Sequence, residues 1–510
     1  MVEEIELKLA LTPKAMEALR RSRLWRSLGA GRMRRQRLVS IYFDTPDRLL
    51  AKSGCALRIR HDGQRRIQTL KIPSAGGGEL HRYGEIETVL EGDRPDLSVV
   101  GNSLPRLLPL GRLRGRLLPV FHTEFERRTM LVTMKGARIE VAFDRGAIVA
   151  ERKRAALCEI ELELKTGNRA RLYELALALS KLAALTVERR TKAARGYTLA
   201  DGGKAPVPRR AEAIALDRAA QAGAAFVAVA RSCLDQMRAN EACLGPGADA
   251  EGVHQMRVAV RRLRALVACY RDWLAPDVHA YLSAKLRRFQ QALGPAREWQ
   301  VFIAGTLAPL AEHLPNNAPL TAMRHAAQAL REGAALTAGA LPGERTYTEF
   351  VLTLALWLET DGWRAPRAAA EMARPASVVA AAILLRRYKR LRKFGGKDAN
   401  TLSEMDLHRL RLLGKKLRYA VEFFSALYPR RPVRRFMDTL SDIQDSLGAL
   451  NDAVVNRSLL ARIDHSLATD TARAAHARGL VQGWEAARIR EDRQAFAEVW
   501  RRFRRLAPYW

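Results

Sequence analysis

Residues 3–9 of the chain read EEIELKL, and this stretch decides the fold of the N-terminal part of the protein. Its charged residues Glu4, Glu6 and Lys8 alternate with aliphatic ones. Side chains two positions apart on a β-strand point to the same face, so this strand would carry charge on one face and hydrocarbon on the other. Helices are predicted after Thr12-Pro13 and over about residues 170–184. Further stretches typical of strands are LVSIYFDT, CALRIRH, RIQTLKIP, RYGEIETVL, FERRTMLVTM, ARIEVAFDRG and CEIELELKTG.

Like charges repeat at intervals of two residues in several of these strands. The repeats are Arg58 and Arg60, Glu85 and Glu87, and the run Glu159, Glu161 and Glu163. A single strand of this kind is usually explained by a solvated polar face. Repeated carboxylates, however, destabilise one another unless a cation lies among them, and clustered glutamate oxygens suit a hard ion such as Mg²⁺ or Mn²⁺. Arginine and lysine suit phosphate oxygens, so a closed barrel lined by both sets would hold a metal-bound polyphosphate.

These motifs resemble those of a known family. EIELK is similar to the ExExK signature of CYTH domains, which are also called triphosphate tunnel metalloenzymes. The resemblance covers residues 1 to about 200 and implies an eight-stranded antiparallel tunnel that hydrolyses or rearranges triphosphates with a divalent metal. Family members include inorganic triphosphatases, thiamine triphosphatases and class IV adenylate cyclases. The later motifs that follow the family's order are YFDTPDRLLAKSGCALRIR, LKIP, GEIE, FERRT, IEVAFDRG, CEIELEL and KAARGY.

The same resemblance implies roles for individual residues. The residues expected to be catalytic are Glu4, Glu6 and Lys8, with Lys8 near the attacked phosphorus. The expected ligands of Mg²⁺ or Mn²⁺ are Glu4, Glu6, Asp144, Glu159, Glu161 and Glu163. The expected phosphate-binding set is Arg58, Arg60, Lys71, Glu85, Glu87, Arg128 and Lys192. Whether Arg127 or Arg128 faces the tunnel depends on the phase of their strand, which the sequence leaves open.

The sequence changes character near residue 205. Residues 204–211 contain two prolines and are typical of a linker, and residues 212–506 are rich in Ala and Leu with helical periodicity. VHQMRVAVRRLRALV from Val253 is repeated 154 positions later as LHRLRLLGKKLRYAV, and LGPAREWQVF is repeated at the same offset as LGALNDAVVN. We therefore expect an α+β protein, with a β-tunnel domain over 1–203 and an all-α domain of two duplicated four-helix bundles, about 212–360 and 366–506.

The helical part resembles a CHAD domain, a type of domain often attached to CYTH domains. His254 and His408 each open a helix with the pattern H-x-x-R-x-x-x-[RK]-[RK]-x-R, which places one His and three basic residues along one helix face. Such a face is usually merely solvated, but few acidic residues compensate it here. The resemblance implies binding of inorganic polyphosphate rather than catalysis. The expected binding residues are His254, Arg257, Arg261, Arg262, Arg264, Arg386, Arg390, Lys393, Lys397, His408, Arg411, Lys415, Lys416 and Arg418.

The composition indicates which binding partners and which cellular compartment to expect. The chain has 87 Lys and Arg against 54 Asp and Glu, a net charge of +33 that calls for an anionic partner. Nucleic acid is not the expected partner, because only 6% of residues are aromatic and no zinc-finger, zipper or RNP pattern occurs. Five cysteines without CxxC spacing argue for a reducing compartment. No apolar run reaches the ~20 residues that span a membrane, so we expect a cytoplasmic protein, with association with polyphosphate granules as a further expectation.

The expected function is metal-dependent hydrolysis of inorganic triphosphate in the tunnel, with polyphosphate bound by the helical domain. Inorganic triphosphate is favoured because no obvious aromatic clamp for a base is apparent. The alternatives are a non-catalytic polyphosphate-tethering protein, a class IV adenylate cyclase and a thiamine triphosphatase. The chain contains no GxxxxGK, GxSxG or HExxH, which excludes a P-loop enzyme, a serine hydrolase of that type and a zincin.

Overall fold

The computed structural model describes residues 2–74, 78–98, 110–203, 205–245, 247, 250–398, 401–466 and 471–510. The chain forms two compact units. Unit 1 comprises Met1–Pro206 and Pro342–Thr360, and unit 2 comprises Val207–Leu341 and Asp361–Trp510. The chain passes from unit 1 to unit 2 inside the predicted linker 204–211, of which Lys204 lies outside the described residues. Residues 342–360, expected at the end of the first helical repeat, belong instead to unit 1.

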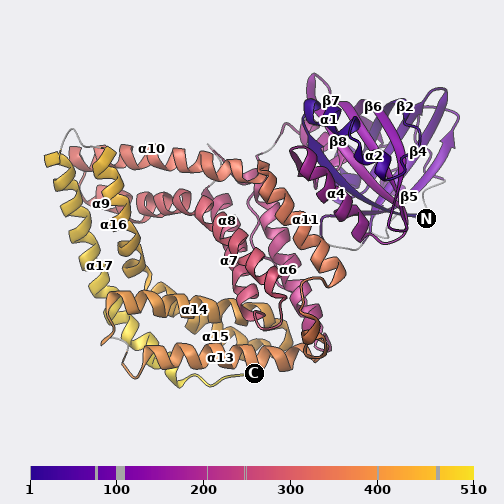
Figure 1. The fold of residues 1–510 in the computed structure, drawn as a ribbon. Helices are drawn as coiled ribbons and strands as arrows, with labels where there is room; N and C mark the ends of the chain where they lie inside the picture. The colour runs from indigo at the N-terminus through magenta and orange to yellow at the C-terminus, as the bar shows by residue number, and fades with distance from the viewer. Residues whose placement is uncertain are drawn as a thin grey trace. The chain divides into compact units, whose positions relative to one another are not determined.

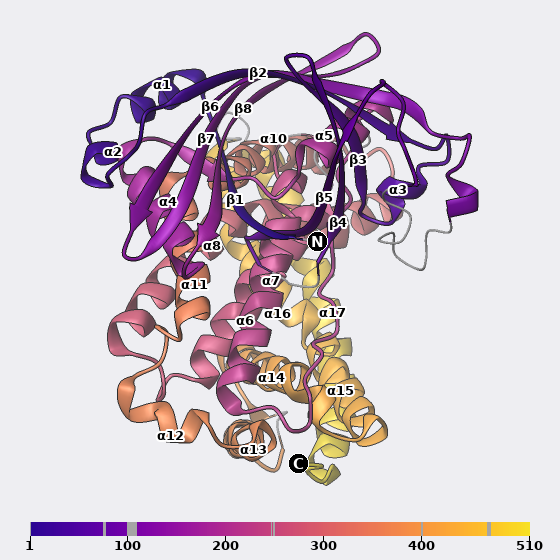
Figure 2. The same ribbon diagram turned by 90° about the vertical axis from the view of Figure 1, so that its right-hand side faces the viewer.

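Unit 1 is built around a closed antiparallel barrel (Figure 1). The sheet order is β5-β4-β3-β2-β6-β7-β8-β1-β9, and an additional pairing of β1 with β5 closes eight of these strands into a ring. Figure 2 shows the strands curving around a common axis. The predicted eight-stranded barrel is thus confirmed. The strands are β1 (Val2–Leu11), β2 (Arg34–Asp44), β3 (Ala56–Asp62), β4 (Arg65–Pro73), β5 (His81–Leu90), β6 (Leu118–Met134), β7 (Ala137–Ala150), β8 (Lys153–Thr166) and β9 (Leu185–Val187).

Strand β1 closes the ring and turns its charged face inward. It pairs with β5 on one edge and with β8 on the other. Because side chains alternate along a strand, Leu7 and Leu9 point outward, where both are 0% exposed and α4 (Ala170–Leu182) contacts β1. The barrel interior is therefore polar, and apolar side chains fill the space between its outer surface and the surrounding helices.

Two helices of unit 1 lie where the sequence predicts them. The helix predicted after Thr12 is α1, and the Thr12 hydroxyl caps it by accepting from the backbone N–H of Ala15 at 3.2 Å. Helix α4 matches the prediction over 170–184. Helix α1 spans Pro13–Arg20. The other helical elements of the unit are α2 (Leu24–Ser27), α3 (Leu49–Lys52), the 3₁₀ turn Leu110–Arg112, α5 (Lys192–Ala200) and α11 (Arg345–Thr360).

Helix α11 joins unit 1 from a distant part of the chain. It packs against α4 and β9, and the Thr348 hydroxyl donates a buried hydrogen bond to the carbonyl of Leu185 at 2.8 Å. Arg169, which precedes α4, pairs with Glu359 near the end of α11. Phe350 and Leu354 are 0% exposed. Since α4 would otherwise expose an apolar surface, unit 1 is discontinuous in sequence and needs this helix to complete its core.

Unit 2 is helical, and its helix boundaries repeat at the offset seen in the sequence. Helices α6, α7 and α8 begin at residues 222, 250 and 276, and α13, α14 and α15 begin 154 residues later in each case. Helix α8 corresponds to α15 and α16 together, because the second repeat breaks at Ser446 and Leu447. The duplication predicted from sequence is therefore present in the fold. The helices are α6 (Ala222–Ala239), α7 (Ala250–Cys269), α8 (Pro276–Phe302), α9 (Ala308–His313), α10 (Ala318–Ala340), α12 (Ala369–Met372), α13 (Ala376–Gly395), α14 (Glu404–Phe424), α15 (Arg430–Asp445), α16 (Gly448–Ser466) and α17 (Thr471–Arg505).

Short helical turns connect several of these helices. A π-helical segment, Ile303–Leu307, joins α8 to α9. The 3₁₀ turns are Glu241–Cys243, Leu341–Gly343, Pro366–Ala368 and Ser425–Leu427. All five cysteines are free thiols. Among the helices of the described ranges, none is long and apolar enough to cross a bilayer.

Candidate active site and a second anion-binding cavity

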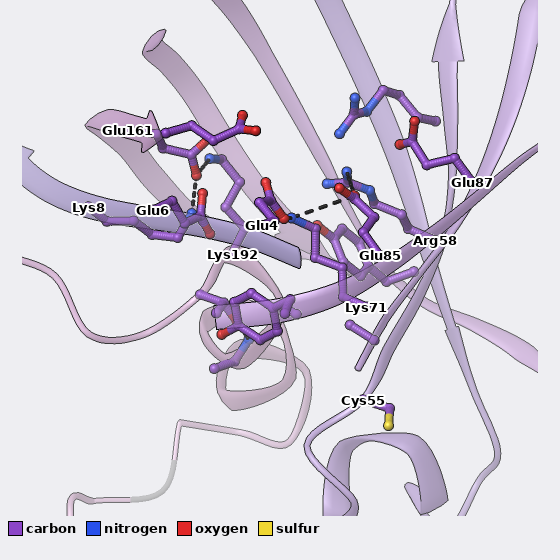
Figure 3. Close-up of a pocket in the computed structure, with 18 of the residues that line it drawn as sticks. Glu4, Glu6, Lys8, Cys55, Arg58, Lys71, Glu85, Glu87, Glu161 and Lys192 are labelled. Carbon is purple, nitrogen blue, oxygen red and sulfur yellow. Dashed lines mark hydrogen bonds and ion pairs between the residues drawn. The ribbon is translucent and has the colours of Figure 1, made fainter. Parts of the chain in front are cut away.

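A cavity of about 330 Å³ lies inside the barrel of unit 1 (Figure 3). Its wall carries equal numbers of acidic and basic side chains, seven of each. The acidic ones are Glu4, Glu6, Glu85, Glu87, Glu140, Glu161 and Glu163. The basic ones are Lys8, Arg58, Arg60, Lys71, Arg127, Lys165 and Lys192. The strand alternation read from the sequence therefore brings most of both predicted sets to the wall of one cavity, with Asp144, Glu159 and Arg128 as the exceptions.

The carboxylate of Glu4 lies at one side of this cavity beside Lys71. The Lys71 ammonium bonds to Glu4 and lies 3.7 Å from a carboxylate oxygen of Glu85 (Figure 3). Burial raises the pKa of Glu4 to about 7, although Lys71 acts in the opposite direction. Burial thus disfavours the charged form of Glu4, and a metal ion bound there would favour that form.

Lys8 lies on β1, as Glu4 does, at the other end of the row formed by Glu4, Glu6 and Lys8. Its ammonium contacts Glu6 at 2.9 Å and bonds to Glu161, which stands opposite Lys8 in the β1–β8 pair. Burial opposes the charge on Glu6, but Lys8 holds the pKa of this carboxyl below its usual value. These three buried side chains form one ion cluster in which each charge has a partner.

Lys192, in the first turn of α5, lies within a cluster of three carboxylates. Its ammonium is 2.7 Å from Asp144, 2.6 Å from Glu159 and 2.8 Å from Glu161. These carboxylate oxygens lie within 4.8 Å of one another and could hold a metal ion. Asp144 and Glu159, however, are 0% exposed and lie outside the cavity wall. The ammonium of Lys192 therefore occupies the centre of the acidic cluster that was predicted to bind metal.

Arg127, and not Arg128, faces the interior of the barrel. Arg127 stands opposite Asp144 in the β6–β7 pair, bonds to both its oxygens at 2.7 and 2.6 Å, and also bonds to Glu161. Arg128 points to the other face of β6 and pairs with Glu126 at 2.6 Å. The expectation that Arg128 binds phosphate is wrong, because the register of β6 turns its side chain away from the cavity.

Three arginines form the most strongly cationic part of the cavity wall. Arg58 lies 3.6 Å from Glu85, and the Nε atoms of Arg58 and Arg60 are buried with no hydrogen-bond partner among the described residues. The neighbouring Arg58 guanidinium, then burial and Arg127, lower the pKa of Arg60 to about 10. Unpaired buried donors beside a like charge are suited to an incoming anion.

Several residues of the cavity wall are not among the site residues predicted from the sequence. Glu140 and Lys165 lie near Glu163, and Lys165 bonds to Glu163 at 2.5 Å. Tyr42, Tyr83 and Tyr197 also line the cavity, so aromatic side chains that were not among the predicted site residues are present in its wall. The strand alternation could have revealed Tyr83 and Glu140, because each shares the parity of a predicted neighbour on its own strand.

A second cavity, of about 550 Å³, lies within unit 2 and has a different charge balance. Six lysines and arginines line it, together with two histidines, against only Glu298 and Asp452. Burial, followed by the surrounding arginines, lowers the pKa of Lys415 to about 7. The predicted residues in this wall are His254, Arg257, Arg261, His408, Arg411, Lys415 and Arg418, joined by the unpredicted Arg297.

The wall of this second cavity repeats the sequence duplication. Arg418 donates to the side chain of Gln444 at 3.1 Å, and its counterpart Arg264 donates in the same way to Gln290, 154 residues before Gln444. Glu298 and Asp452 form another pair at this offset, as do His254 and His408. The Nδ1 atoms of both histidines are buried without a hydrogen-bond partner among the described residues. Corresponding residues of the two repeats thus line one cavity, although Arg264, the counterpart of Arg418, lies outside its wall.

Other residues predicted to bind polyphosphate lie elsewhere. Arg262 is 0% exposed and bonds to Glu422 at 2.7 Å and to Gln236 at 2.9 Å, so it belongs to a buried network and not to a binding surface. Arg386 is exposed and pairs with Asp272 at 3.0 Å. Those outside the cavity wall are Arg262, Arg264, Arg386, Arg390, Lys393, Lys397 and Lys416. A helical stripe read from spacing alone therefore includes residues that point in several directions.

The chain combines a barrel that has a charged interior with a duplicated helical unit. It is thus a two-domain protein, and models of two families match its two parts. The model of the CYTH domain matches residues 3–197, and that of the CHAD domain matches residues 228–461. The chain therefore contains a CYTH domain followed by a CHAD domain. It is 34% identical over 203 residues to an inorganic triphosphatase of Haemophilus influenzae. That match covers 39% of this chain and 55% of the relative, so the chain spans about half of the relative's length.

Solved structures are similar to each part. The CHAD domain from the plant Ricinus communis is 29% identical with a TM-score of 0.48, and the match covers 57% of this chain and 97% of that one. A putative adenylyl cyclase from Hippeastrum, described as having a dominant triphosphatase activity, is 18% identical with a TM-score of 0.26. That match covers 38% of this chain and 95% of the other.

Proposed function

We propose that unit 1 hydrolyses inorganic triphosphate with a divalent metal ion, Mg²⁺ or Mn²⁺, and that unit 2 binds inorganic polyphosphate. The observation that carries the first proposal is the equal number of acidic and basic side chains around the barrel cavity. Triphosphate brings about four or five negative charges at neutral pH. A wall whose own charges cancel cannot neutralise them, so further cations must enter with the substrate.

The residues fit such a metal ion. Glu4, Glu6, Glu161 and Glu163 all line the cavity, where a metal ion could reach their oxygens. Burial raises the pKa of Glu4 to about 7 and also raises the pKa of Glu163, and a bound cation would favour their charged forms. Asp144 and Glu159, by contrast, are 0% exposed and lie outside the cavity wall, where Lys192 contacts both. We therefore favour the carboxylates of the cavity wall as ligands, with Asp144 and Glu159 serving as counterions of Lys192. The ligands would be Glu4, Glu6, Glu161 and Glu163.

The chain's own basic residues would hold the substrate. Arg58 and Arg60 offer buried Nε donors to phosphate oxygens, and Arg127 supplies charge while Asp144 and Glu161 fix its orientation. Lys8 remains an ammonium because its carboxylate partners favour the charged form. The metal, when bound, would neutralise phosphate charge and activate a water for in-line attack. The protein's contribution is then positioning and electrostatic stabilisation of the reacting phosphate.

Phosphate release from triphosphate, measured with Mg²⁺ or Mn²⁺ on the full-length protein, tests this function. Replacement of Glu4 or Glu6 by Gln should lower kcat by about 100-fold or more, whereas Glu126→Gln, on the outer face of β6, should leave it unchanged. ATP and thiamine triphosphate serve as competing substrates, and cyclic AMP formation tests the cyclase alternative. A wild-type protein that binds triphosphate, releases no phosphate from any of the three substrates with either metal, and forms no cyclic AMP would leave the tethering alternative.

The charge of the second cavity carries the proposal for unit 2. Six basic side chains face two acidic ones there, so a polyanion can enter without an accompanying metal. Each repeat contributes a histidine and three basic side chains to the cavity wall, which suits a ligand that repeats the same phosphate unit along its length. Neutralisation of many phosphates releases counterions, and binding should therefore weaken steeply with salt, as it does for other dense polyanions.

Binding of long-chain polyphosphate, measured over a range of salt concentrations, tests this second function. The double variant Arg257→Gln with Arg411→Gln should weaken binding and flatten the salt dependence. Arg409→Gln is the matched control, since Arg409 lies on the same helix as Arg411 but is exposed and paired with Asp406. Equal competition by duplex DNA would indicate a general polyanion site and contradict polyphosphate as the specific ligand.

A further inference from the structure

Two side chains of β5, His81 and Tyr83, lie beside the catalytic candidates, and no role has yet been derived for them. In the antiparallel β1–β5 pair, Tyr83 stands opposite Glu4 and His81 stands opposite Glu6. Opposed residues of an antiparallel pair project to the same face of the sheet. His81 and Tyr83 therefore share the inner face of the barrel with the two glutamates.

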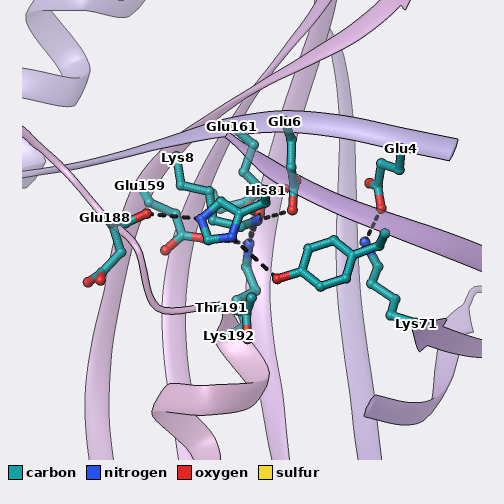
Figure 4. Close-up of polar contacts among 12 residues, drawn as sticks. Glu4, Glu6, Lys8, Lys71, His81, Glu159, Glu161, Glu188, Thr191 and Lys192 are labelled. Carbon is teal, nitrogen blue, oxygen red and sulfur yellow. Dashed lines mark hydrogen bonds and ion pairs between the residues drawn. The ribbon is translucent and has the colours of Figure 1, made fainter. Parts of the chain in front are cut away.

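The imidazole of His81 is held at both nitrogens (Figure 4). Its Nε2 lies 3.1 Å from the backbone carbonyl oxygen of Glu188, and its Nδ1 lies 3.3 Å from the hydroxyl of Tyr83. A carbonyl oxygen can only accept, so Nε2 carries a proton. Burial, together with Lys8, lowers the pKa of His81 and favours the neutral ring, whose Nδ1 then accepts from the Tyr83 hydroxyl.

The ring of Tyr83 in turn faces Lys71. The Lys71 ammonium lies 5.6 Å from the centre of this ring, which is within the range of a cation–π interaction. The same ammonium bonds to Glu4 and approaches Glu85. Tyr83 lines the cavity, and its ring therefore limits the positions that Lys71 can take when a phosphate competes with Glu4 for its charge.

His81 also fixes the backbone that leads into α5. Glu188, whose carbonyl accepts from His81, donates its own N–H to the carbonyl of Lys8 at 2.9 Å. Three residues later the Thr191 side chain caps α5, and Lys192 follows in the first turn of that helix. One imidazole thus joins β5, β1 and the segment that places Lys192 among its carboxylates.

We propose that His81 and Tyr83 are positioning residues of the tunnel, with Tyr83 orienting the Lys71 ammonium toward the substrate and His81 fixing both the Tyr83 ring and the start of α5. The inference rests on the proposed triphosphatase function. It assigns neither residue to the chemical step: Tyr83 lines the cavity but acts through the Lys71 ammonium, and His81 lies behind the cavity wall.

The experiment compares four variants of the full-length protein: Tyr83→Phe, Tyr83→Leu, His81→Gln and His81→Leu. Tyr83→Leu removes the aromatic face and should raise KM for triphosphate about tenfold with a smaller change in kcat. Tyr83→Phe keeps that face and should stay within about threefold of wild type. A glutamine amide can donate to Glu188 and accept from Tyr83, so His81→Gln should recover most of the activity that His81→Leu loses.

Three readouts separate positioning from simple packing. They are KM against kcat, affinity for a non-hydrolysable imidotriphosphate in the presence of Mg²⁺, and the melting temperature. His122→Leu, on the outer face of β6, is the matched control. The proposal is overturned if Tyr83→Leu lowers the melting temperature while KM and analogue affinity stay unchanged, or if His81→Gln fails to recover activity. If wild type binds the analogue but releases no phosphate, the triphosphatase function fails while the binding comparison still tests the positioning role.

Discussion

Lys8 and Glu161 stand opposite each other on β1 and β8, and the ammonium of Lys8 donates to the carboxylate of Glu161 inside the barrel. Burial alone would lower the pKa of Lys8, but Glu161, Glu6 and Glu159 together raise it well above its usual value. Lys8 therefore stays charged over the whole physiological range. It is suited to stabilise negative charge on phosphate and not to accept a proton from water.

Replacement of Lys8 by Gln should accordingly lower kcat for triphosphate by about 100-fold or more, through loss of electrostatic stabilisation. Because Lys8 also holds the pKa of Glu6 below its usual value, its loss should shift the ascending limb of the pH–rate profile to higher pH. Steady-state kinetics between pH 6 and 9 would measure both effects, with Lys14→Gln on the exposed side of α1 as the control. A variant that keeps the wild-type kcat and the wild-type profile would contradict this electrostatic role.

Arg127 and Arg128 offer a matched pair of substitutions in adjacent positions. Arg127→Gln removes a cavity charge and leaves Asp144 and Glu161 with less compensation, so it should lower kcat/KM by about 100-fold and reduce stability. Arg128→Gln removes only an external pair with Glu126 and should change kcat/KM by less than about twofold. Kinetics and thermal unfolding of both variants measure the difference, and equal losses in the two would contradict the assigned strand phase.

Removal of divalent metal should separate the two units functionally. The barrel cavity has balanced charges and needs added cations, whereas the cavity of unit 2 has an excess of basic groups. A chelator such as EDTA should therefore abolish phosphate release from triphosphate but preserve binding of long-chain polyphosphate. Both can be measured on one preparation, and a parallel loss of polyphosphate binding would show that unit 2 also depends on metal.

Lys415 should make the proposed affinity of unit 2 for polyphosphate depend on pH near neutrality. Its pKa is lowered to about 7, so it is charged below that pH and loses its charge as the pH rises. A bound polyanion favours the charged form, so affinity should fall between pH 6 and 8 and binding near pH 7.5 should take up protons. Calorimetry in two buffers of different ionisation enthalpy measures this uptake.

Two variants of Lys415 check the assignment. Lys415→Arg should retain affinity but lose the proton uptake, because arginine does not titrate in this range, and Lys415→Gln should lose both. In the absence of ligand, pH acts on the stability of the fold with the opposite sign. The Lys415 side chain keeps its proton up to about pH 10.4 in the unfolded chain, but only up to about pH 7 in the folded one. This residue therefore makes the free energy of unfolding rise with pH from about 7 upward. Unchanged proton uptake in Lys415→Gln would assign the titration to another group.

Helix α11 should be required for the stability of unit 1. The Thr348 hydroxyl satisfies the carbonyl of Leu185 in a buried position, so Thr348→Val should lower the free energy of unfolding by about 1–2 kcal/mol. A fragment ending at residue 205 lacks the whole helix and should be less stable than the full chain, with a tendency to aggregate. Thr346→Val, in the same helix, is the control, and denaturant unfolding is the measurement. A fragment as stable as the intact unit would show that α11 is dispensable.

The sequence by itself determined the strands, the polar interior and the duplication. Alternation at Glu4, Glu6 and Lys8 identifies a two-faced strand, because the period of two is a local property of extended backbone. The offset of 154 residues likewise appears in the sequence and returns in the starts of α7 and α14. Both signals can be read without the tertiary structure. The alternation depends only on residues close in sequence, and the offset depends only on comparison of two segments of the sequence.

Only the tertiary structure decided which side chains meet. The choice between Arg127 and Arg128 depends on the pairing of β6 with β7, and the burial of Arg262 depends on Glu422, 160 residues away. The membership of α11 in unit 1 depends on an apolar face of α4 that local periodicity cannot assign to a partner. The position of Lys192 among Asp144, Glu159 and Glu161 has the same origin, because charge compensation in a buried site is a non-local property of the packed chain.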